Sequence, residues 1–241
     1  MRLAPLLLIL LVFALPAALL AASGERERAP APPPRQQAPA PVPTTAPVPL
    51  PPVVTPTPQP RAAEPLPRSR AVGQPWSGRL VHGRRLPSQG PGYATWDPIL
   101  KRVGNRAWRR WGTGRLLATL RRVLADYARR HPGAPPVLIG DLSRPRGGDF
   151  GPRFGGIGHA SHQTGLDADV YYPRTDGRLR RARRPEQVDR AAAQELVDAF
   201  VQEGAQYVFV GPSLDLRGPS RIVQPLVNHD DHLHVRLRPA G

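Results

Sequence analysis

Apolar residues recur every three or four positions in two stretches of the chain, a spacing that predicts two amphipathic helices. We expect the first helix at about 105–130, ended by the sequence His131-Pro132-Gly133, and the second at 185–203. The residues expected to face the core are Trp108, Trp111, Leu116, Leu120, Val123, Leu124 and Tyr127 in the first helix and Val188, Ala192, Leu196, Ala199 and Phe200 in the second.

Shorter apolar or alternating segments predict strands at 137–139, 166–172, 207–210 and 232–238. The region through Trp96 is rich in Gly and Pro, and we expect it to be irregular. Helices and short strands follow one another without a regular strand–helix–strand rhythm. The predicted fold class is therefore α+β, with a small antiparallel sheet flanked by helices.

The N-terminal part of the chain does not have the pattern of a packed domain. A positive charge at Arg2, the apolar run at 3–22 and the small residues that end it predict a signal peptide or membrane anchor at 1–23. The segment 24–73 is Pro/Ala-rich and is expected to be a disordered, extended linker, a tether for one domain at 74–241. Either fate of the N-terminal segment, cleavage or retention as an anchor on the membrane, places that domain in the periplasm or cell envelope.

The overall composition narrows the chemistry that the domain can perform. The chain has no Cys, which excludes disulfides, thiol nucleophiles and Cys-type zinc sites, so metal ligands must be His, Asp or Glu. The formal net charge of +16 attracts polyanions. An exported protein meets acidic envelope polymers, and we expect no nucleic-acid partner. The basic run at 178–184 is interpreted as a solvated loop, with attraction to anionic wall polymers as the alternative.

The histidines gather in two short windows, at 159–162 and 229–234, with Asp167 and Asp169 between them. Because residues two apart on a strand share a face, Asp167 and Asp169 should point to one side of their strand. The second window should alternate in the same way, with Leu233 on the core side. If the two strands lie side by side, their polar faces form one site. The histidines concerned are His159, His162, His229, His232 and His234.

Such a face has the ligands that Zn²⁺ prefers. Imidazole nitrogens with one carboxylate oxygen suit this cation, and catalytic sites use three protein ligands with one position open to water. The bound metal would activate water and polarise a carbonyl group. A neighbouring histidine that is not a ligand could accept the proton of the water or stabilise an oxyanion.

The two windows, together with Ile139-Gly140-Asp141, resemble the penicillin-insensitive murein endopeptidases. The resemblance rests on the segment His159-Ala160-Ser161-His162-Gln163-Thr164-Gly165-Leu166-Asp167-Ala168-Asp169 and on the closing His232-Leu233-His234. Lysostaphin, D-Ala-D-Ala carboxypeptidases and hedgehog signalling domains belong to the same wider group of zinc proteins. The resemblance implies that His162, Asp169 and His234 bind Zn²⁺, with His159 as a candidate additional ligand. It also implies a base or oxyanion-stabilising role for His232 and, less firmly, His229.

The resulting functional hypothesis is an exported zinc metalloendopeptidase. By resemblance, its substrate would be the peptide cross-links of peptidoglycan between D-alanine and meso-diaminopimelate. The alternatives are a D,D-carboxypeptidase that acts on the same polymer and a non-catalytic, zinc-containing module that binds the cell wall. The sequence gives no indication of the oligomeric state.

Several nearby residues have no settled role at this point. Asp167 is expected to orient a ligand imidazole, the alternative being a solvated strand residue. For Asp230 and Asp231 the sequence does not favour either of these two roles. Asp141 and Ser143 are interpreted as turn residues, with a place in the substrate groove as the alternative. Of the aromatic residues, Tyr93 and Trp96 are the preferred candidates for a substrate-binding wall, because those at 108–127 are expected to be core.

Overall fold

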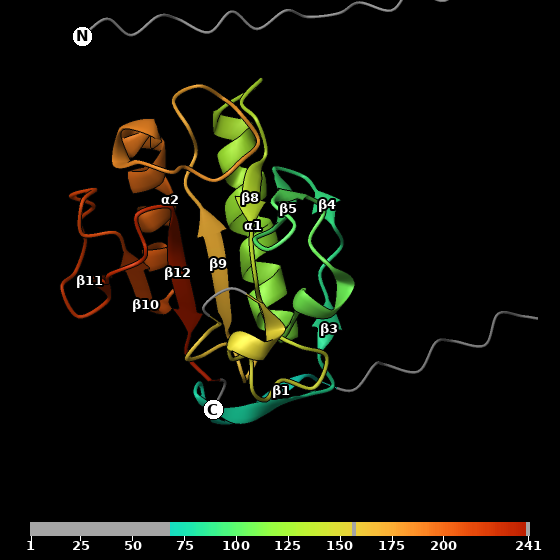
Figure 1. Cartoon of the computed structure of the whole chain (residues 1–241). Helices are drawn as coiled ribbons and strands as arrows, with labels where there is room; N and C mark the ends of the chain where they lie inside the picture. The colour runs from blue at the N-terminus through green and yellow to red at the C-terminus, as the bar shows by residue number, and fades with distance from the viewer. Residues whose placement is uncertain (1–67, 156–157, 240–241) are drawn as a thin grey trace, which may run out of the picture. The chain divides into compact units, whose positions relative to one another are not determined.

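A computed structural model describes residues 68–155 and 158–239 of the chain (Figure 1). The expected export segment, and the expected linker up to residue 67, lie outside the described residues. The strands are β1 (Arg70–Gln74), β2 (Ser77–Val81), β3 (Arg84–Arg85), β4 (Gln89–Gly90), β5 (Tyr93–Asp97), β6 (Arg102–Val103), β7 (Trp111–Gly112), β8 (Val137–Ile139), β9 (Asp167–Tyr171), β10 (Ala205–Val210), β11 (Val223–Pro225) and β12 (His232–Leu237). The α-helices are α1 (Gly114–Arg130) and α2 (Arg190–Gln202), and short 3-10 helices lie at η1 (Ala107–Arg109), η2 (Pro152–Phe154) and η3 (Pro185–Gln187).

The fold is mixed α+β, as predicted, but its sheet is larger than expected and is not purely antiparallel. The main sheet has the strand order β11-β10-β12-β9-β8-β5-β4, with β6 beside β5. Its pairs β5–β8 and β10–β11 are parallel, whereas β12 is antiparallel to both of its neighbours. The region through Trp96 was expected to be irregular, and that expectation is wrong. It forms β1 to β5, with Gly and Pro at turns such as that between β1 and β2.

Both predicted helices exist, but both begin later than the apolar pattern predicts. The side chain of Thr113 accepts a hydrogen bond from Leu116 N at 3.2 Å and caps α1, so η1 and β7 occupy the residues before it. Asp189 caps α2 by accepting from Ala192 N at 3.1 Å. The predicted stop at His131 is confirmed. Predicted strands at 137–139, 166–172, 207–210 and 232–238 correspond to β8, β9, β10 and β12.

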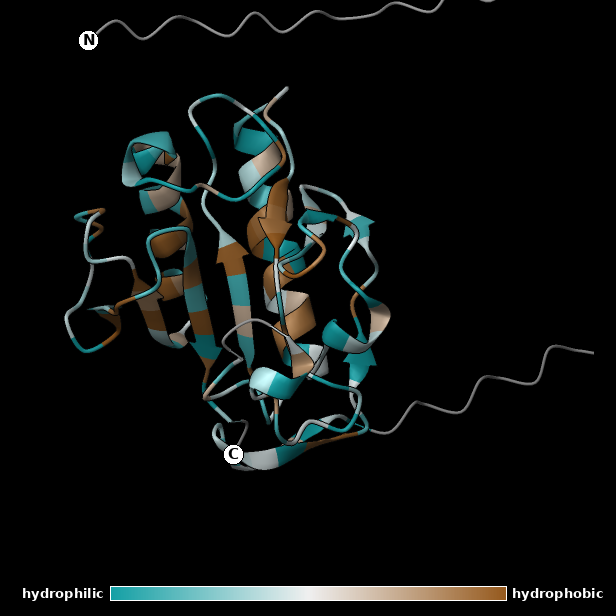
Figure 2. Cartoon of the chain, in the orientation of Figure 1, coloured by the Kyte–Doolittle hydropathy of each residue, from teal (hydrophilic) through white to brown (hydrophobic). Residues whose placement is uncertain are grey.

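The helices cover one face of the main sheet and leave the other face available for a site (Figure 1). The buried sides of α1 and α2 pack on the apolar side chains of β9 and β12, including Ala168, Val170, Leu233 and Val235. Figure 2 shows these strands banded in alternating hydrophobic and hydrophilic colours, as a sheet with one covered face requires. Within the described part of the chain, neither helix is long and apolar enough to cross a membrane.

The pairing of β9 with β12 brings the two sequence windows together. In their antiparallel register, His234 lies opposite Asp169, and Arg236 lies opposite Asp167. These residues alternate with the core residues of the same strands, so their side chains point to the face that the helices leave uncovered. The merging of two polar strand faces, expected from the period of two, is confirmed.

Candidate metal and catalytic site

The carboxylate of Asp169 is the centre of a cluster of imidazoles on β9, β12 and the loop before β9. Its Oδ1 lies 3.2 Å from His162 Nε2, 3.3 Å from His234 Nδ1 and 3.7 Å from His232 Nε2. Its Oδ2 lies 3.8 Å from His159 Nδ1. Four of the histidines that the sequence singled out therefore turn one ring nitrogen toward the same carboxyl group.

Outside this centre, three of the four imidazoles are held by their other ring nitrogen. Each donates to a carboxylate, and each carboxylate is in turn paired with an arginine. The distance from imidazole nitrogen to carboxylate oxygen is 2.8 Å for His159 and Asp141, 2.9 Å for His234 and Asp167, and 2.6 Å for His232 and Asp231. We call these units the Arg109 chain (His159–Asp141–Arg109), the Arg236 chain (His234–Asp167–Arg236) and the Arg181 chain (His232–Asp231–Arg181).

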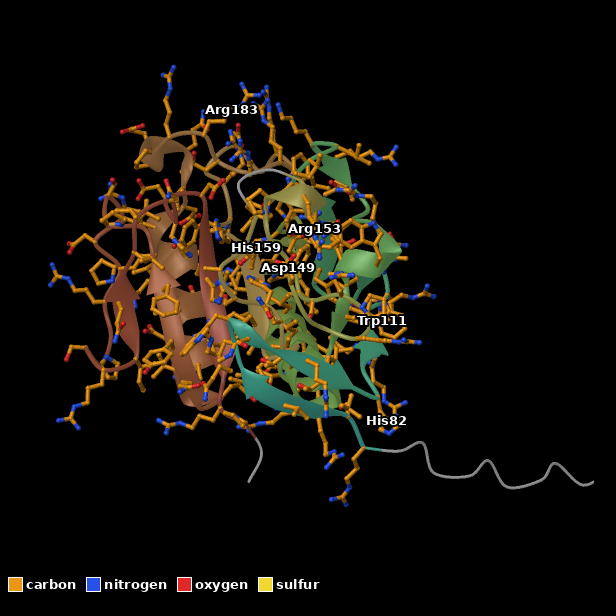
Figure 3. The ribbon with its side chains drawn as sticks, turned by 60° about the horizontal axis from the view of Figure 1, so that its bottom comes forward. His82, Trp111, Asp149, Arg153, His159 and Arg183 are labelled. Atoms are coloured by element: carbon orange, nitrogen blue, oxygen red, sulfur yellow. The ribbon has the colours of Figure 1, made fainter. Side chains whose placement is uncertain are left out.

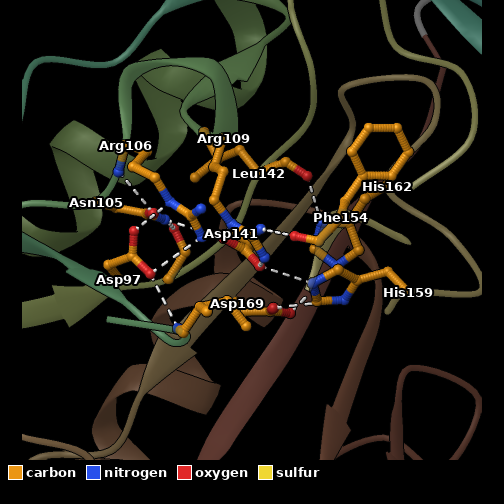
Figure 4. Close-up of polar contacts among 12 residues, drawn as sticks. Asp97, Asn105, Arg106, Arg109, Asp141, Leu142, Phe154, His159, His162 and Asp169 are labelled. Atoms are coloured by element: carbon orange, nitrogen blue, oxygen red, sulfur yellow. Dashed lines mark hydrogen bonds and ion pairs between the residues drawn. The ribbon is translucent and has the colours of Figure 1, made fainter. Parts of the chain in front are cut away.

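The arginine–carboxylate pair of the Arg109 chain is almost completely buried, and Figure 4 shows its contacts. Arg109 is 1% exposed and donates through Nε, at 2.6 Å, and through its terminal nitrogen to the two oxygens of Asp141. Asn105 adds a third hydrogen bond to Asp141 at 3.0 Å, and Arg109 also donates to the carbonyl of Phe154 at 2.6 Å. Asp141 therefore anchors His159, and the turn expected for this residue does not describe its role.

The fourth imidazole, His162, is oriented by the backbone instead. Its Nδ1–H donates to the carbonyl of Leu142, which leaves the lone pair on Nε2 facing Asp169. The ring is completely buried. The residue itself has φ of 69°, in the left-handed region that non-glycine residues rarely occupy. Such conformations persist where surrounding contacts impose them, commonly at functional sites.

The donor set fits a metal cation. His162 Nε2 and Asp169 Oδ1 are buried atoms without a hydrogen-bond partner, although they lie 3.2 Å apart. Asp141, Asp167 and Asp231 each have an arginine partner, but among the described residues no arginine contacts Asp169. A buried carboxylate needs a compensating cation, and lone pairs of imidazole converge on it here. Nitrogen and oxygen donors of this kind suit Zn²⁺.

One compact group of donors contains His162 and Asp169. The ligand atoms of His159, His162 and Asp169 all lie within 4.8 Å of one another, which makes them a compact metal-binding group. His234 Nδ1, on the other side, is closer to Asp169 than is His159 Nδ1, at 3.3 against 3.8 Å. The compact group thus contains His159, the candidate additional ligand, whereas the expected ligand His234 lies beside Asp169 outside that group.

The electrostatics keep the carboxylates of the site ionised. Burial alone would raise the pKa of Asp169, but the facing imidazoles, with His162 first, hold that pKa well below its usual range. Burial also opposes ionisation of Asp167, yet the hydrogen bond from His234 helps lower its pKa to about 2. The site therefore keeps an ionised carboxylate at its centre.

The histidines of β12 and of the loop before it differ in their protonation. Burial lowers the pKa of His229 to about 4, with help from the neighbouring His232. Burial also opposes protonation of His232, but the carboxylates of Asp169 and Asp231 outweigh it and raise the pKa. His229 donates from Nδ1 to the carbonyl of Val227 at 2.8 Å, and its ring lies 4.7 Å from that of His232. It therefore offers Nε2 as an acceptor beside His232.

A large cleft opens over the cluster. Its volume is about 1160 Å³, larger than most small-molecule sites and sufficient for an extended or branched peptide. The walls come from segments distant in sequence, namely the turn between β1 and β2, the loops after β5 and β9, and the loop before β12. Trp76, Leu226 and Val227 contribute exposed apolar surface to it, and Arg181 and Arg183 contribute positive charge.

Comparison with known proteins places the chain in a family. The model of the family described as penicillin-insensitive murein endopeptidase matches residues 71–209. The chain belongs to this family. The proteins of that name from Klebsiella pneumoniae (strain MGH 78578) and Escherichia coli (strain SE11) are 30% and 29% identical to it over 200 and 202 residues. These alignments cover 72% and 73% of this chain and 68% and 69% of the respective relatives.

More distant similarity extends to the penicillin-insensitive murein endopeptidase of Haemophilus influenzae, 26% identical over 196 residues. That alignment covers 70% of this chain and 64% of the relative. The family match ends in β10, before the second histidine window. The residues of β12 enter the site through their pairing with β9.

The structure brings the sequence-predicted site residues of this murein endopeptidase family member together at one cleft. His159, Asp169, His229, His232 and His234 line it, and His162 lies directly beneath. The expected ligand-orienting role of Asp167 agrees with its hydrogen bond to His234. Asp231 holds His232, whereas Asp230 accepts from the backbone and hydroxyl of Ser213 at 3.1 Å.

Other expectations about the cleft were wrong, and some contributors were missed. Tyr93 and Trp96 are buried in β5, at 2% and 5% exposure, and cannot form a substrate wall. Trp76, 61% exposed at the turn between β1 and β2, is the tryptophan that lines the cleft. Arg236 shares the strand face of His234, a period-two signal that could have found it. Arg109 gave no such signal, because it lies 32 residues before Asp141.

Proposed function

We propose that this protein is an exported zinc endopeptidase that hydrolyses the peptide cross-links of peptidoglycan between D-alanine and meso-diaminopimelate. The observation that carries the proposal is the buried carboxylate of Asp169, which has four imidazoles around it and no arginine partner among the described residues. Membership of a family whose relatives are named murein endopeptidases supports the substrate.

His162, Asp169 and His234 would hold the metal, with His159 as a further ligand beside them. Their outer partners, Leu142 for His162 and Asp167 for His234, fix the tautomers that leave the inward nitrogens unprotonated. When bound, Zn²⁺ supplies Lewis acidity, which lowers the pKa of a water molecule and polarises the carbonyl of the scissile bond.

His232 is the group best placed to move the proton. Its Nδ1–H is held by Asp231 at 2.6 Å, so its Nε2 points into the cleft beside Asp169. There Nε2 would accept the proton of the attacking water and return it to the amine that leaves. Asp231 stabilises the imidazolium formed in between, and the pair with Arg181 holds Asp231 in place. His229, next to His232, is the secondary candidate for this role.

The expected location agrees with such a substrate. An export segment at 1–23 followed by a Pro/Ala-rich linker would deliver the domain to the periplasm or cell envelope, where the polymer lies. The linker would let the domain reach peptide cross-links at a distance from the membrane if the N-terminal segment is retained. The domain was proposed to span residues 74–241, and the strand β1 (Arg70–Gln74) begins before that boundary.

The test is turnover of purified, zinc-loaded protein on cross-linked muropeptide dimers, followed by mass spectrometry. We expect conversion to monomers that is lost with a chelator and restored by Zn²⁺. Release of free D-alanine without loss of dimers would instead identify a D,D-carboxypeptidase. Absence of any conversion by protein shown to contain zinc would overturn the enzymatic proposal and leave a wall-binding module.

A further inference from the structure

The basic loop after β9 has a fixed backbone. Arg174, whose side chain is 3% exposed, pairs with Asp176 and donates to Gln187 Oε1 at 2.9 Å and to the carbonyl of Arg181 at 3.3 Å. Gln187 Oε1 also accepts from the backbone N–H of Arg183 at 2.8 Å. Two positions of the loop, Arg181 and Arg183, are thereby tied to buried or half-buried groups.

The arginines of this loop do not share one environment. Ala182 is completely buried in the hydrophobic core, and its neighbours Arg181 and Arg183 line the cleft. Arg178, Arg180 and Arg184 are exposed and do not line it. The interpretation of the whole run as a solvated loop thus holds for these three residues, whereas the buried alanine presents the other two arginines to the site.

Arg181 and Arg183 differ in how far their charges are satisfied. Arg181 uses one terminal nitrogen to pair with Asp231 at 2.7 Å, and its other donors stay available. The guanidinium of Arg183 has no hydrogen-bond or ion-pair partner among the described residues. Figure 3 labels Arg183 and His159, which both line the cleft. A ligand that enters the cleft thus meets an unpaired positive charge at this rim.

The opposite end of the cleft has different chemistry. The turn between β1 and β2, which contains Trp76, lies at the end of the domain away from the loop after β9 (Figure 1). Trp76 is exposed and apolar. A peptide bound across the cleft therefore has one end near positive charge and another near apolar surface. Such asymmetry fixes the direction of binding.

We infer that Arg183, with the free donors of Arg181, forms a subsite for a carboxylate of the peptide substrate, on the side of the leaving amine. This inference rests on the proposed function. In a cross-link through the side-chain amine of meso-diaminopimelate, the carbon attached to the scissile nitrogen carries a free carboxylate. Arg181 is joined through Asp231 to His232, the residue that would protonate that nitrogen. A guanidinium binds a carboxylate through paired, charge-assisted hydrogen bonds.

The experiment compares two cross-linked dimers, one with that carboxylate free and one with it amidated. For wild-type protein we expect kcat/KM to be about tenfold higher on the free acid, the effect of one charge-assisted contact at an exposed site. Arg183→Gln should lower kcat/KM on the acid by about the same factor and leave the amide almost unchanged. Arg183→Lys should restore part of the preference.

Arg184→Gln is the matched control, because it removes the same charge from the adjacent exposed position that does not line the cleft. It should keep the wild-type preference. Melting temperatures of all variants show whether each is folded. Equal kcat/KM of wild type on the two dimers, or an unchanged preference in folded Arg183→Gln protein, would overturn the inference.

Binding separates this inference from the proposed function. The uncross-linked peptide L-Ala-D-Glu-meso-diaminopimelate is titrated into zinc-loaded protein by calorimetry. The carboxylate on the carbon that bears its free amine is either left as the acid or amidated. This measurement needs no turnover. We expect tighter binding of the acid to wild type and equal binding of the two forms to Arg183→Gln. If neither dimer is cleaved but this difference holds, the endopeptidase proposal fails and the subsite stands. If dimers are cleaved but the two peptides bind wild type equally, the subsite fails alone.

Discussion

The Arg109 and Arg181 chains have the same chemistry and opposite surroundings. In both, an arginine holds a carboxylate that holds a histidine next to Asp169. The side chain of Arg109 is 1% exposed, whereas that of Arg181 is 45% exposed at the rim of the cleft. Burial places the Arg109–Asp141 pair in the interior, and exposure leaves Arg181 within reach of solvent and substrate. Under the proposed function, the same three residue types would anchor a metal ligand in one case and orient a proton carrier in the other.

Replacement of His159 and of His232, the histidines of the two chains, should give the largest difference in zinc binding and turnover. We expect His232→Ala to retain zinc and to lose turnover by about 100-fold or more, because a positioned acid–base group contributes on that scale. His159→Ala should lower zinc affinity. The measurements are zinc content after dialysis and turnover of cross-linked dimers. His131→Ala, outside the cleft, is the control and should change neither. Equal retention of zinc in the two site variants would contradict the assigned difference.

Removal of the arginines should separate the chains by stability. Arg109→Met leaves the buried carboxylate of Asp141 without its guanidinium partner and should cost about 3–5 kcal/mol of unfolding free energy. Arg181→Met breaks a pair that is partly in water and should cost less than about 1 kcal/mol. Urea unfolding of both variants measures the difference. Similar losses of unfolding free energy in the two would show that burial does not distinguish the chains.

Neutralising the two carboxylates sharpens the comparison further. Asp141→Asn should weaken zinc binding by about 10- to 100-fold, as for other outer partners of metal ligands, through misorientation of His159. Asp231→Asn should lower kcat with little change in zinc affinity or KM, since it orients His232. A competitive zinc-chelator titration and steady-state kinetics test the two. A loss of zinc affinity in Asp231→Asn equal to that in Asp141→Asn would contradict the division of roles.

An ion pair outside the site gives a small expected effect that depends on pH. Asp97 has an inaccessible side chain that accepts from Ile99 N, Leu100 N and Arg106. Burial opposes ionisation, but the hydrogen bonds from Leu100 and Arg106 hold the pKa of Asp97 below its ordinary value. A depressed pKa in the folded state means that ionised Asp97 stabilises the fold above the unfolded pKa and that this stability is lost as the pH falls.

For that pair we expect Asp97→Asn to reduce unfolding free energy by about 1 kcal/mol at pH 7. The difference between variant and wild type should shrink below about pH 4, where the unfolded carboxyl group begins to protonate. Urea unfolding at several pH values measures it. A difference that stays constant from pH 7 to pH 3 would show that the ionisation of Asp97 does not contribute.

The positions of site residues are predicted best where a single alternating pattern contains both the core residues and the site residues. On β9 and β12, alternation assigned Asp169 and His234 to one face and Leu233 to the other, and the register confirms it. The sequence predicts poorly which side chains interact when the two residues are far apart along the chain. The anchoring of Asp141 by Arg109 depends on the packing of separate segments, which no periodicity encodes. Likewise, Thr113 overrides the apolar pattern before α1 by capping the helix.

The site can form only if β9 and β12 pair in the observed register. Because side chains alternate, the insertion of a single residue in either strand would turn Leu233 or Ala168 toward the cleft and carry donors into the core. Metal affinity would then report directly on correct strand alignment during folding. Insertions should accordingly be tolerated in the surrounding loops but not within these two short segments, whose lengths are as constrained as their chemistry.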